Sequence, residues 1–246
     1  MSLLSTLMGR VSLFTLLISL QIPIAKAQTL ILNDANGPPY TTLGRDGFLD
    51  VVGEKIFKQA GVDVKLIRTP AERGLRNANE GIDDGEITRI EGIDKVYTNL
   101  IRVPEKIVDM DFVAFSKMDL QLQGWDSLRN HNLGFILGWK IFEAHTNGFQ
   151  YVQSVRNSDI LFSMLAKDRI DVALYSRWVG LSILKEKKLK GIHVLEPALA
   201  TREMFIYLNK KHSVLVPKIT DALREIKQSG EYERLFKEKV INSVIQ

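Results

Sequence analysis

Few residues of this chain have the types and the spacing that catalysis or metal binding requires. The four histidines lack the spacing of a metal site, and the sequence contains neither a GxSxG segment nor a phosphate-binding loop. The segment Asp34-Ala-Asn-Gly37 opens like a calcium loop, but its twelfth position is Arg45, where calcium coordination needs a glutamate. Asp83 and Asp84 precede a glycine, a pattern typical of a turn. We therefore predict no enzyme, no cofactor and no metal.

Two arginines have positions that suit the binding of an anionic group. Arg89 follows a turn at Gly85 on a short apolar strand, where a guanidinium group can hold a carboxylate through two parallel hydrogen bonds. Arg73 lies in an expected helix and either holds an anionic group or belongs to a solvated helix face. Its neighbour Glu72 completes a capping box that begins at Thr69, so we assign Glu72 a structural role at the start of that helix.

Aromatic residues next to the ends of expected strands could form the walls of a binding pocket. Tyr40 follows two prolines at the carboxyl end of a strand, where open α/β sheets bind their ligands, or it packs on its own lobe. Phe48 begins the next helix and either lines the pocket or packs in the core. Trp139 follows Gly138 between a strand and a helix, where backbone N–H groups could hold an anion opposite the indole. The alternative for Trp139 is packing between elements of its lobe.

The elements that must position these residues are short strands alternating with helices. Apolar residues recur at helical spacing between 47 and 60, and every second residue is apolar between 62 and 66. This alternation predicts an α/β fold with mainly parallel sheets. The expected strands are 29–32, 62–66, 107–115, 133–137, 151–155, 170–175, 193–195 and 204–208. The expected helices are 47–60, 70–81, a short one after Trp139, 158–166, 177–188 and a C-terminal helix across 219–235.

The first 27 residues have the features of a secretory signal peptide. They contain no acidic residue, carry Arg10 before an apolar stretch, and end on Ala25-Lys26-Ala27, a small-x-small cleavage pattern. An anchor helix is disfavoured because a glutamine and a proline interrupt the apolar run. We predict cleavage before Gln28 and a periplasmic protein.

Composition excludes several classes of protein. The chain has 246 residues, 45% of them hydrophobic, and no cysteine, which excludes disulfide scaffolds, thiolate metal sites and lipid attachment through an N-terminal cysteine. Removing Arg10 and Lys26 lowers the formal net charge from +4 to +2. Because no stripe of basic residues interleaved with aromatics occurs, we predict no binding to nucleic acid.

Short motifs after residue 27 follow one another in a recognisable order. They are Gly37-Pro-Pro-Tyr40, Gly47-Phe-Leu-Asp50, Asn79-Glu-Gly-Ile-Asp-Asp84, Trp125-Asp-Ser-Leu128, Asp168-Arg-Ile-Asp171 and the helix 219–232. Together they resemble the bacterial extracellular solute-binding proteins of family 3, typified by the amino-acid receptors of ABC transporters, which have the two-lobed type II periplasmic binding fold. Pro70, Arg73 and Leu75 are similar to a short, divergent subgroup of that family.

The resemblance implies two lobes with a ligand between them. One lobe would comprise 28–115 together with 200–246 and the other 116–199, with the chain crossing between them near 116–124 and 196–202. Tyr175 and Ser176 end a strand where ligands of this family make polar contacts. Family members usually have an aspartate there for the α-ammonium group, and a Thr-x-x-Arg motif for the α-carboxylate, from which Arg89 is offset here. The expected ligand is therefore a small, anionic or zwitterionic, amino-acid-like solute.

The same resemblance implies capture of this solute for ABC-type uptake or for sensing. The partner would be an ABC permease or a membrane sensor, and we expect the chain to be a monomer. Two alternative functions remain open. One is a periplasmic enzyme on the same scaffold, of the cyclohexadienyl dehydratase type, and the other is a sensory binding protein without a permease.

Overall fold

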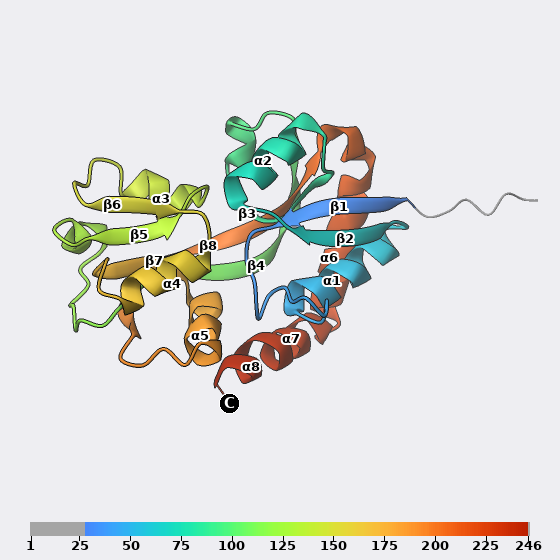
Figure 1. The fold of residues 1–246 in the computed structure, drawn as a ribbon. Helices are drawn as coiled ribbons and strands as arrows, with labels where there is room; N and C mark the ends of the chain where they lie inside the picture. Colours follow the sequence, from blue (N-terminus) through green and yellow to red (C-terminus); the bar gives the residue numbers. More distant parts are fainter. Residues whose placement is uncertain (1–27, 246) are drawn as a thin grey trace, which may run out of the picture.

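Two groups of helices and strands lie next to each other in the computed structural model, which describes residues 28–245 (Figure 1). A sheet of eight strands runs through both groups in the order β2-β1-β3-β8-β4-β7-β5-β6. The predicted α/β, two-lobed fold is confirmed, whereas the predicted signal peptide, residues 1–27, lies outside the described residues. The strands are β1 (Thr29–Asp34), β2 (Asp63–Arg68), β3 (Gly85–Ile90), β4 (Leu100–Ser116), β5 (Leu133–Ile136), β6 (Val152–Val155), β7 (Val172–Ser176) and β8 (His193–Asn209).

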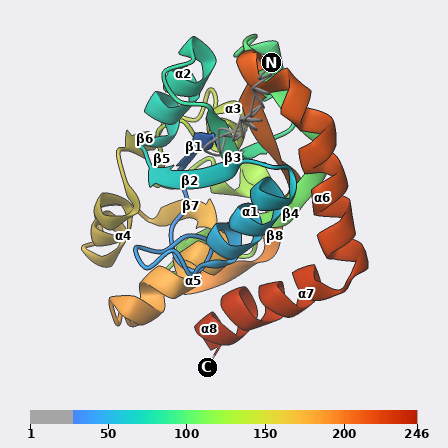
Figure 2. The ribbon, with the colours of Figure 1, turned by 90° about the vertical axis from the view of Figure 1, so that its right-hand side faces the viewer.

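The first lobe is built on the parallel strands β1, β2 and β3. β1 lies between the other two and pairs in parallel with both. The helices of this lobe include α1 (Phe48–Gln59), α2 (Ala71–Glu80), α6 (Val216–Gln228) and α7 (Glu231–Phe236). α2 ends at Gly81, as predicted, in the left-handed conformation that glycine adopts readily. Figure 2 shows α6 along one side of this lobe, next to α1.

The second lobe repeats this arrangement with β5, β6 and β7, of which β5 pairs in parallel with both others. Its helices are α3 (Lys140–His145), α4 (Ser158–Ala166) and α5 (Arg177–Glu186), and the C-terminal α8 (Asn242–Ile245) contacts α5. Asn157 caps α4 by accepting a hydrogen bond from the Ile160 N–H at 3.0 Å. The helix predicted over 158–166 is confirmed, with Asn157 as its cap. None of the helices within residues 28–245 is long and apolar enough to cross a membrane.

Two long antiparallel strands, β4 and β8, connect the lobes. Each has 17 residues, and their pairing extends from Leu100 opposite Asn209 to Ser116 opposite His193. The prediction of two separate strands at 193–195 and 204–208 was wrong, because a shift of register opposite 112–114 accommodates Pro197 within one continuous strand. The lobe boundaries derived from the resemblance remain a prediction.

Two helical glycines of the core allow a direct test of packing. A Cβ on Gly180 in α5 would overlap the ring of Phe115, whereas a Cβ on Gly53 in α1 would lie 3.7 Å from Ile87 Cδ1, an ordinary contact. We expect Gly180→Ala to lower the free energy of unfolding by about 1–3 kcal/mol. Gly53→Ala should raise it by roughly 0.5–1 kcal/mol through helix propensity. Urea unfolding of the two variants checks this; equal effects of both substitutions would contradict the packing around Phe115.

Candidate ligand-binding cleft

A cavity of about 40 Å³ lies between the two lobes. Its first-lobe side follows β1 and β3, its second-lobe side follows β5, and the crossing strands form its floor. The lobes touch around this cavity, whose volume suits a few water molecules. Entry of a solute therefore requires the lobes to move apart, and a solute of amino-acid size also requires flexible side chains of the lining, such as Met110 and Met204, to shift. The lining residues are Ala35, Asn36, Thr88, Arg89, Ile90, Ile93, Met110, Phe112, Gly138, Trp139, Lys140, Ile141 and Met204.

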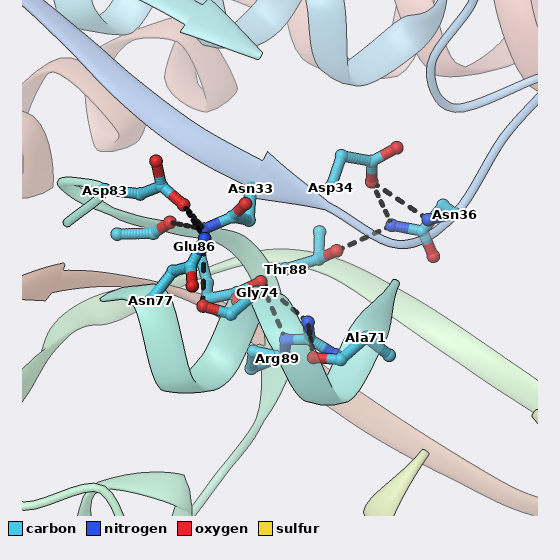
Figure 3. A network of polar contacts seen from close by, with 11 residues as sticks. Asn33, Asp34, Asn36, Ala71, Gly74, Asn77, Asp83, Glu86, Thr88 and Arg89 are labelled. Carbon is cyan, nitrogen blue, oxygen red and sulfur yellow. Dashed lines mark hydrogen bonds and ion pairs between the residues drawn. The ribbon is translucent and has the colours of Figure 1, made fainter. Parts of the chain in front are cut away.

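Arg89 enters the cavity from β3 and is paired with Glu86 of the same strand (Figure 3). A shift of register against β8 between Glu86 and Arg89 brings these two side chains together. Glu86 Oε2 accepts from Arg89 Nε at 2.9 Å and lies 2.8 Å from Nη2, which also donates to the Ala71 carbonyl at 3.0 Å. These contacts use Nε and Nη2, so Nη1 is the part of the guanidinium group that remains for a solute.

Burial perturbs the carboxyl group of Glu86 strongly. The side chain is fully buried, and Oε1 has no hydrogen-bond partner within residues 28–245. Loss of hydration raises the pKa of Glu86 from 4.5 to about 8, although the charge of Arg89 opposes this rise. The negative charges of Asp34 and Asp83 add to it. Burial thus favours the protonated form of Glu86.

Thr88 adds a second polar group to the first-lobe side of the cavity. Asn36 Nδ2 donates to Thr88 Oγ1 at 2.7 Å and to Asp34 Oδ1 at 2.7 Å (Figure 3). Asp34 in turn accepts from the Thr41 hydroxyl. Because Thr88 Oγ1 accepts from Asn36, its hydroxyl hydrogen is available to a solute. Thr88 and Arg89 together present hydrogen-bond donors to the cavity.

Aromatic side chains form the second-lobe wall. Trp139 lines the cavity and stacks on Tyr175, with ring centroids 4.6 Å apart and an interplanar angle of 16°. On another side it stacks on Phe142 at 5.7 Å, and Phe112 of β4 meets it edge to face at 6.1 Å. This packing fixes the indole as a rigid apolar surface opposite Arg89.

A salt bridge connects the lobes at the edge of the cavity. Lys140 Nζ of α3 lies 2.6 Å from Glu72 Oε2 of α2 and 3.0 Å from Glu143 Oε2 of its own helix. Glu72 Oε1 also accepts from Tyr97 at 3.2 Å and from Arg76 at 3.3 Å. Partial burial opposes ionisation of Glu72, but these bonds hold its pKa below the ordinary value. Each charge keeps a partner in its own lobe, so the lobes can separate without leaving either one unpaired.

Gly138 lies against the backbone of α2 in the opposite lobe. A Cβ there would lie 2.9 Å from Glu72 Cα and still nearer to Glu72 N. The backbone φ of Gly138 is +89°, which also favours glycine. Its N–H donates to Glu143 Oε1 at 2.8 Å, and the Trp139 N–H donates to the Ile136 carbonyl. The chain itself therefore provides acceptors for these two N–H groups, and an anion site on the N–H groups at the start of α3 stays a prediction.

The structure brings two of the seven predicted binding residues, Arg89 and Trp139, into the cavity. Tyr40 and Phe48 are instead fully buried in the first lobe, where Phe48 packs edge to face on Tyr232 at 5.2 Å. Neither lines the cavity, because Phe48 packs against the C-terminal helix α7 and Tyr40 packs edge to face on Phe48 at 6.4 Å. The alternative of core packing holds for these two residues.

The other three predicted residues also lie outside the cavity lining. Arg73 is exposed on α2. Tyr175 lies behind Trp139, and Ser176 is buried with no partner for its Oγ within residues 28–245. The capping-box role of Glu72 was also wrong, because helix α2 begins without a side-chain cap and Glu72 binds Lys140 instead.

Three further polar residues at or next to the cavity, Glu86, Thr88 and Lys140, were not predicted from the sequence. Glu86 and Arg89 are three residues apart, and in a regular strand such residues point to opposite faces, so only the shift of register pairs them. Lys140 gains its role from a contact with the other lobe. No pattern along the chain reports either feature. Within residues 28–245, no group of three or more His, Asp or Glu side chains could hold a metal ion.

The chain has a distant relative in sequence. No protein-family model matches the chain. An uncharacterized protein of Shewanella oneidensis is 28% identical over 196 residues, which cover 72% of this chain and 69% of that protein.

Solved structures show the same fold at low sequence identity. A mutant of ArgBP from T. maritima has a TM-score of 0.73 at 17% identity, covering 85% of this chain and 94% of that one. The amino-acid ABC transporter substrate-binding protein AbpA from Streptococcus pneumoniae has a TM-score of 0.73 at 14% identity, covering 89% and 97%. A histidine kinase sensor domain similar to periplasmic binding proteins reaches 0.75 at 15% identity, covering 86% and 96%. The chain therefore has the two-lobed fold of periplasmic binding proteins.

Proposed function

We propose that this protein is a periplasmic solute-binding protein that closes its lobes around a small, amino-acid-like solute carrying a carboxylate. The observation that carries this proposal is the cavity between the lobes, where Thr88 and Arg89 face Trp139. Closure around a solute uses contacts from both lobes, so binding shifts the population toward the closed arrangement. The proposed location rests on the features of residues 1–27 and on the fold, and we propose a monomer.

The chemistry of the lining supports a carboxylate with an apolar body. Arg89 Nη1 and the Thr88 hydroxyl are donors, which suit the oxygens of a carboxylate. The cavity lining contains no carboxyl group that could hold an ammonium group or act as a catalytic acid. The geometry therefore supports binding over acid catalysis, and recognition of a carboxylate over recognition of a free amino group. Besides Trp139, the lining contains seven apolar side chains: Ala35, Ile90, Ile93, Met110, Phe112, Ile141 and Met204.

A role in sensing is a second candidate for the same binding event. The similarity to a histidine kinase sensor domain supports it, and the similarity to ABC transporter substrate-binding proteins supports uptake. An adjacent permease and ATPase gene pair would favour uptake, and an adjacent sensor kinase gene would favour sensing.

A thermal-shift screen of the purified protein tests the proposed function. The library should pair each carboxylate with its amide and each α-amino acid with its deaminated analogue. We expect carboxylates to raise the melting temperature more than their amides, because a solute that binds only the native state stabilises it by mass action. Removal of the α-amino group should change little. Scattering should show a smaller radius of gyration with the best carboxylate bound.

The exposed Arg73 offers a matched control for this screen, because it lies on α2 of the same lobe but outside the cavity lining. Arg73→Ala should leave the ranking of solutes unchanged. Tight binding of amides or of basic amino acids in preference to carboxylates would show that the site has been assigned wrongly.

A further inference from the structure

We propose that Glu86 decides whether this cleft accepts a carboxylate: when protonated it leaves the charge of Arg89 to the solute, and when ionised it neutralises that charge from inside the protein. This inference rests on the function proposed above, because it concerns the same cleft. It makes Glu86 a positioning residue that acts through Arg89 and does not itself line the cavity.

The geometry of the pair supports this role. Arg89 makes all its contacts with Glu86 through one oxygen, Oε2, and Oε1 has no donor within residues 28–245. A Cβ on Gly74 would lie 2.7 Å from Oε1, so this oxygen faces the backbone of α2 at a place without solvent. Burial of an ionised carboxylate with one oxygen lacking donors costs more free energy than burial of a neutral carboxyl group.

Charged and neutral groups of the elements packed around Glu86 set its electrostatic environment. β1 supplies Asn33 and Asp34, and the turn before β3 supplies Asp83, which accepts from Asn33 at 3.1 Å. α2 presents its backbone at Ala71 and Gly74. On β8 the register partner is Tyr207, whose hydroxyl donates to the Ile90 carbonyl. The charge of Arg89 opposes burial, whereas the charges of Asp34 and Asp83 act with it, and the net result raises the pKa of Glu86 to about 8.

Binding of a solute carboxylate at Arg89 is then linked to protonation of Glu86. A solute carboxylate at Arg89 Nη1 repels an ionised Glu86, so binding above about pH 8 requires one proton from solvent, which attaches to Glu86 Oε1. No other bond forms or breaks. Affinity for a carboxylate should be constant below about pH 8 and fall by up to about tenfold per pH unit above it.

Acetate and acetamide, which have the same shape and differ in charge, are suitable probes for this linkage. Their affinities can be measured between pH 6 and pH 9.5 from the NMR signal of the Trp139 indole, which lines the cavity. We expect acetate to bind the unmodified protein at least tenfold more weakly at pH 9.5 than at pH 6. In Glu86→Gln the affinity for acetate should not depend on pH, because the amide imitates the protonated form. Glu80→Gln, at an exposed position of α2, should behave like the unmodified protein.

The outcomes separate this inference from the proposed function. If acetate binds the unmodified protein equally at all pH values, the inference fails while the proposed function stands. If acetate binds neither the unmodified protein nor Glu86→Gln at any pH, both fail. A measurement on the unmodified protein covers the case in which the variant does not fold: the ¹³C signal of the Glu86 carboxyl group should titrate near pH 8, and titration near its ordinary value of 4.5 overturns the inference.

Discussion

Replacing Gly138 by alanine is expected to weaken solute binding by roughly a hundredfold or more, about 2.7 kcal/mol of binding free energy. The added methyl group would meet the backbone of Glu72 in the opposite lobe, which cannot move aside as a side chain can. The lobes then cannot come into full contact. The bound solute consequently lacks its contacts with Trp139 and with the other lining residues of the second lobe. Calorimetry with the best solute of the screen measures the affinity, and scattering measures whether the radius of gyration still falls.

Gly148→Ala is the matched control for this substitution. Gly148 lies in the same lobe with φ +81°, close to the +89° of Gly138, but no atom lies within 4 Å of its added Cβ. Both variants therefore carry the same backbone penalty, roughly 1–2 kcal/mol of folding free energy. Only Gly138→Ala should lose affinity and closure. Equal affinities of the two variants would contradict the contact between Gly138 and α2.

Much of the fold could be predicted because its signals are local. The end of α2 follows from Gly81, and α1 and α4 follow from apolar periodicity and turn residues. β8 could not be predicted in the same way. Pro197 interrupts the pattern of a strand, and only the partner strand β4, far away in the sequence, tolerates it through a shift of register.

The site was harder to predict than the fold, because its geometry depends on contacts between distant segments. Arg89 and Trp139 could be recognised from their positions next to strand ends. The residue type of Glu72 fits a capping box, yet its carboxylate pairs with Lys140 from the other lobe. An aromatic residue such as Tyr40 at a strand end can face a cleft or the core, and the sequence pattern is the same in both cases.

Replacing Arg89 by methionine should reduce both the stability of the protein and its affinity for a carboxylate. The substitution leaves Glu86 buried without its cation. At a pH at which Glu86 is ionised, breaking a buried ion pair in this way costs about 3–5 kcal/mol. The loss should depend on pH. Between about pH 4.5 and pH 8 the native state binds one proton more than the unfolded chain, because the pKa of Glu86 is raised on folding. The free energy of unfolding therefore falls as pH rises, by at most about 1.4 kcal/mol per pH unit.

Without Arg89 the pKa of Glu86 should rise further, so Arg89→Met should lose more stability at pH 9 than at pH 6. Urea unfolding at both pH values measures this difference. The double variant Arg89→Met/Glu86→Gln separates the two roles of the arginine, because it removes the buried charge that Arg89→Met exposes to an apolar environment. We expect it to recover most of the stability while carboxylate affinity stays tenfold to a hundredfold reduced, as loss of one charged hydrogen bond of about 1.5–3 kcal/mol predicts. Recovery of affinity together with stability would mean that Arg89 only supports the fold and that the carboxylate binds elsewhere in the cleft.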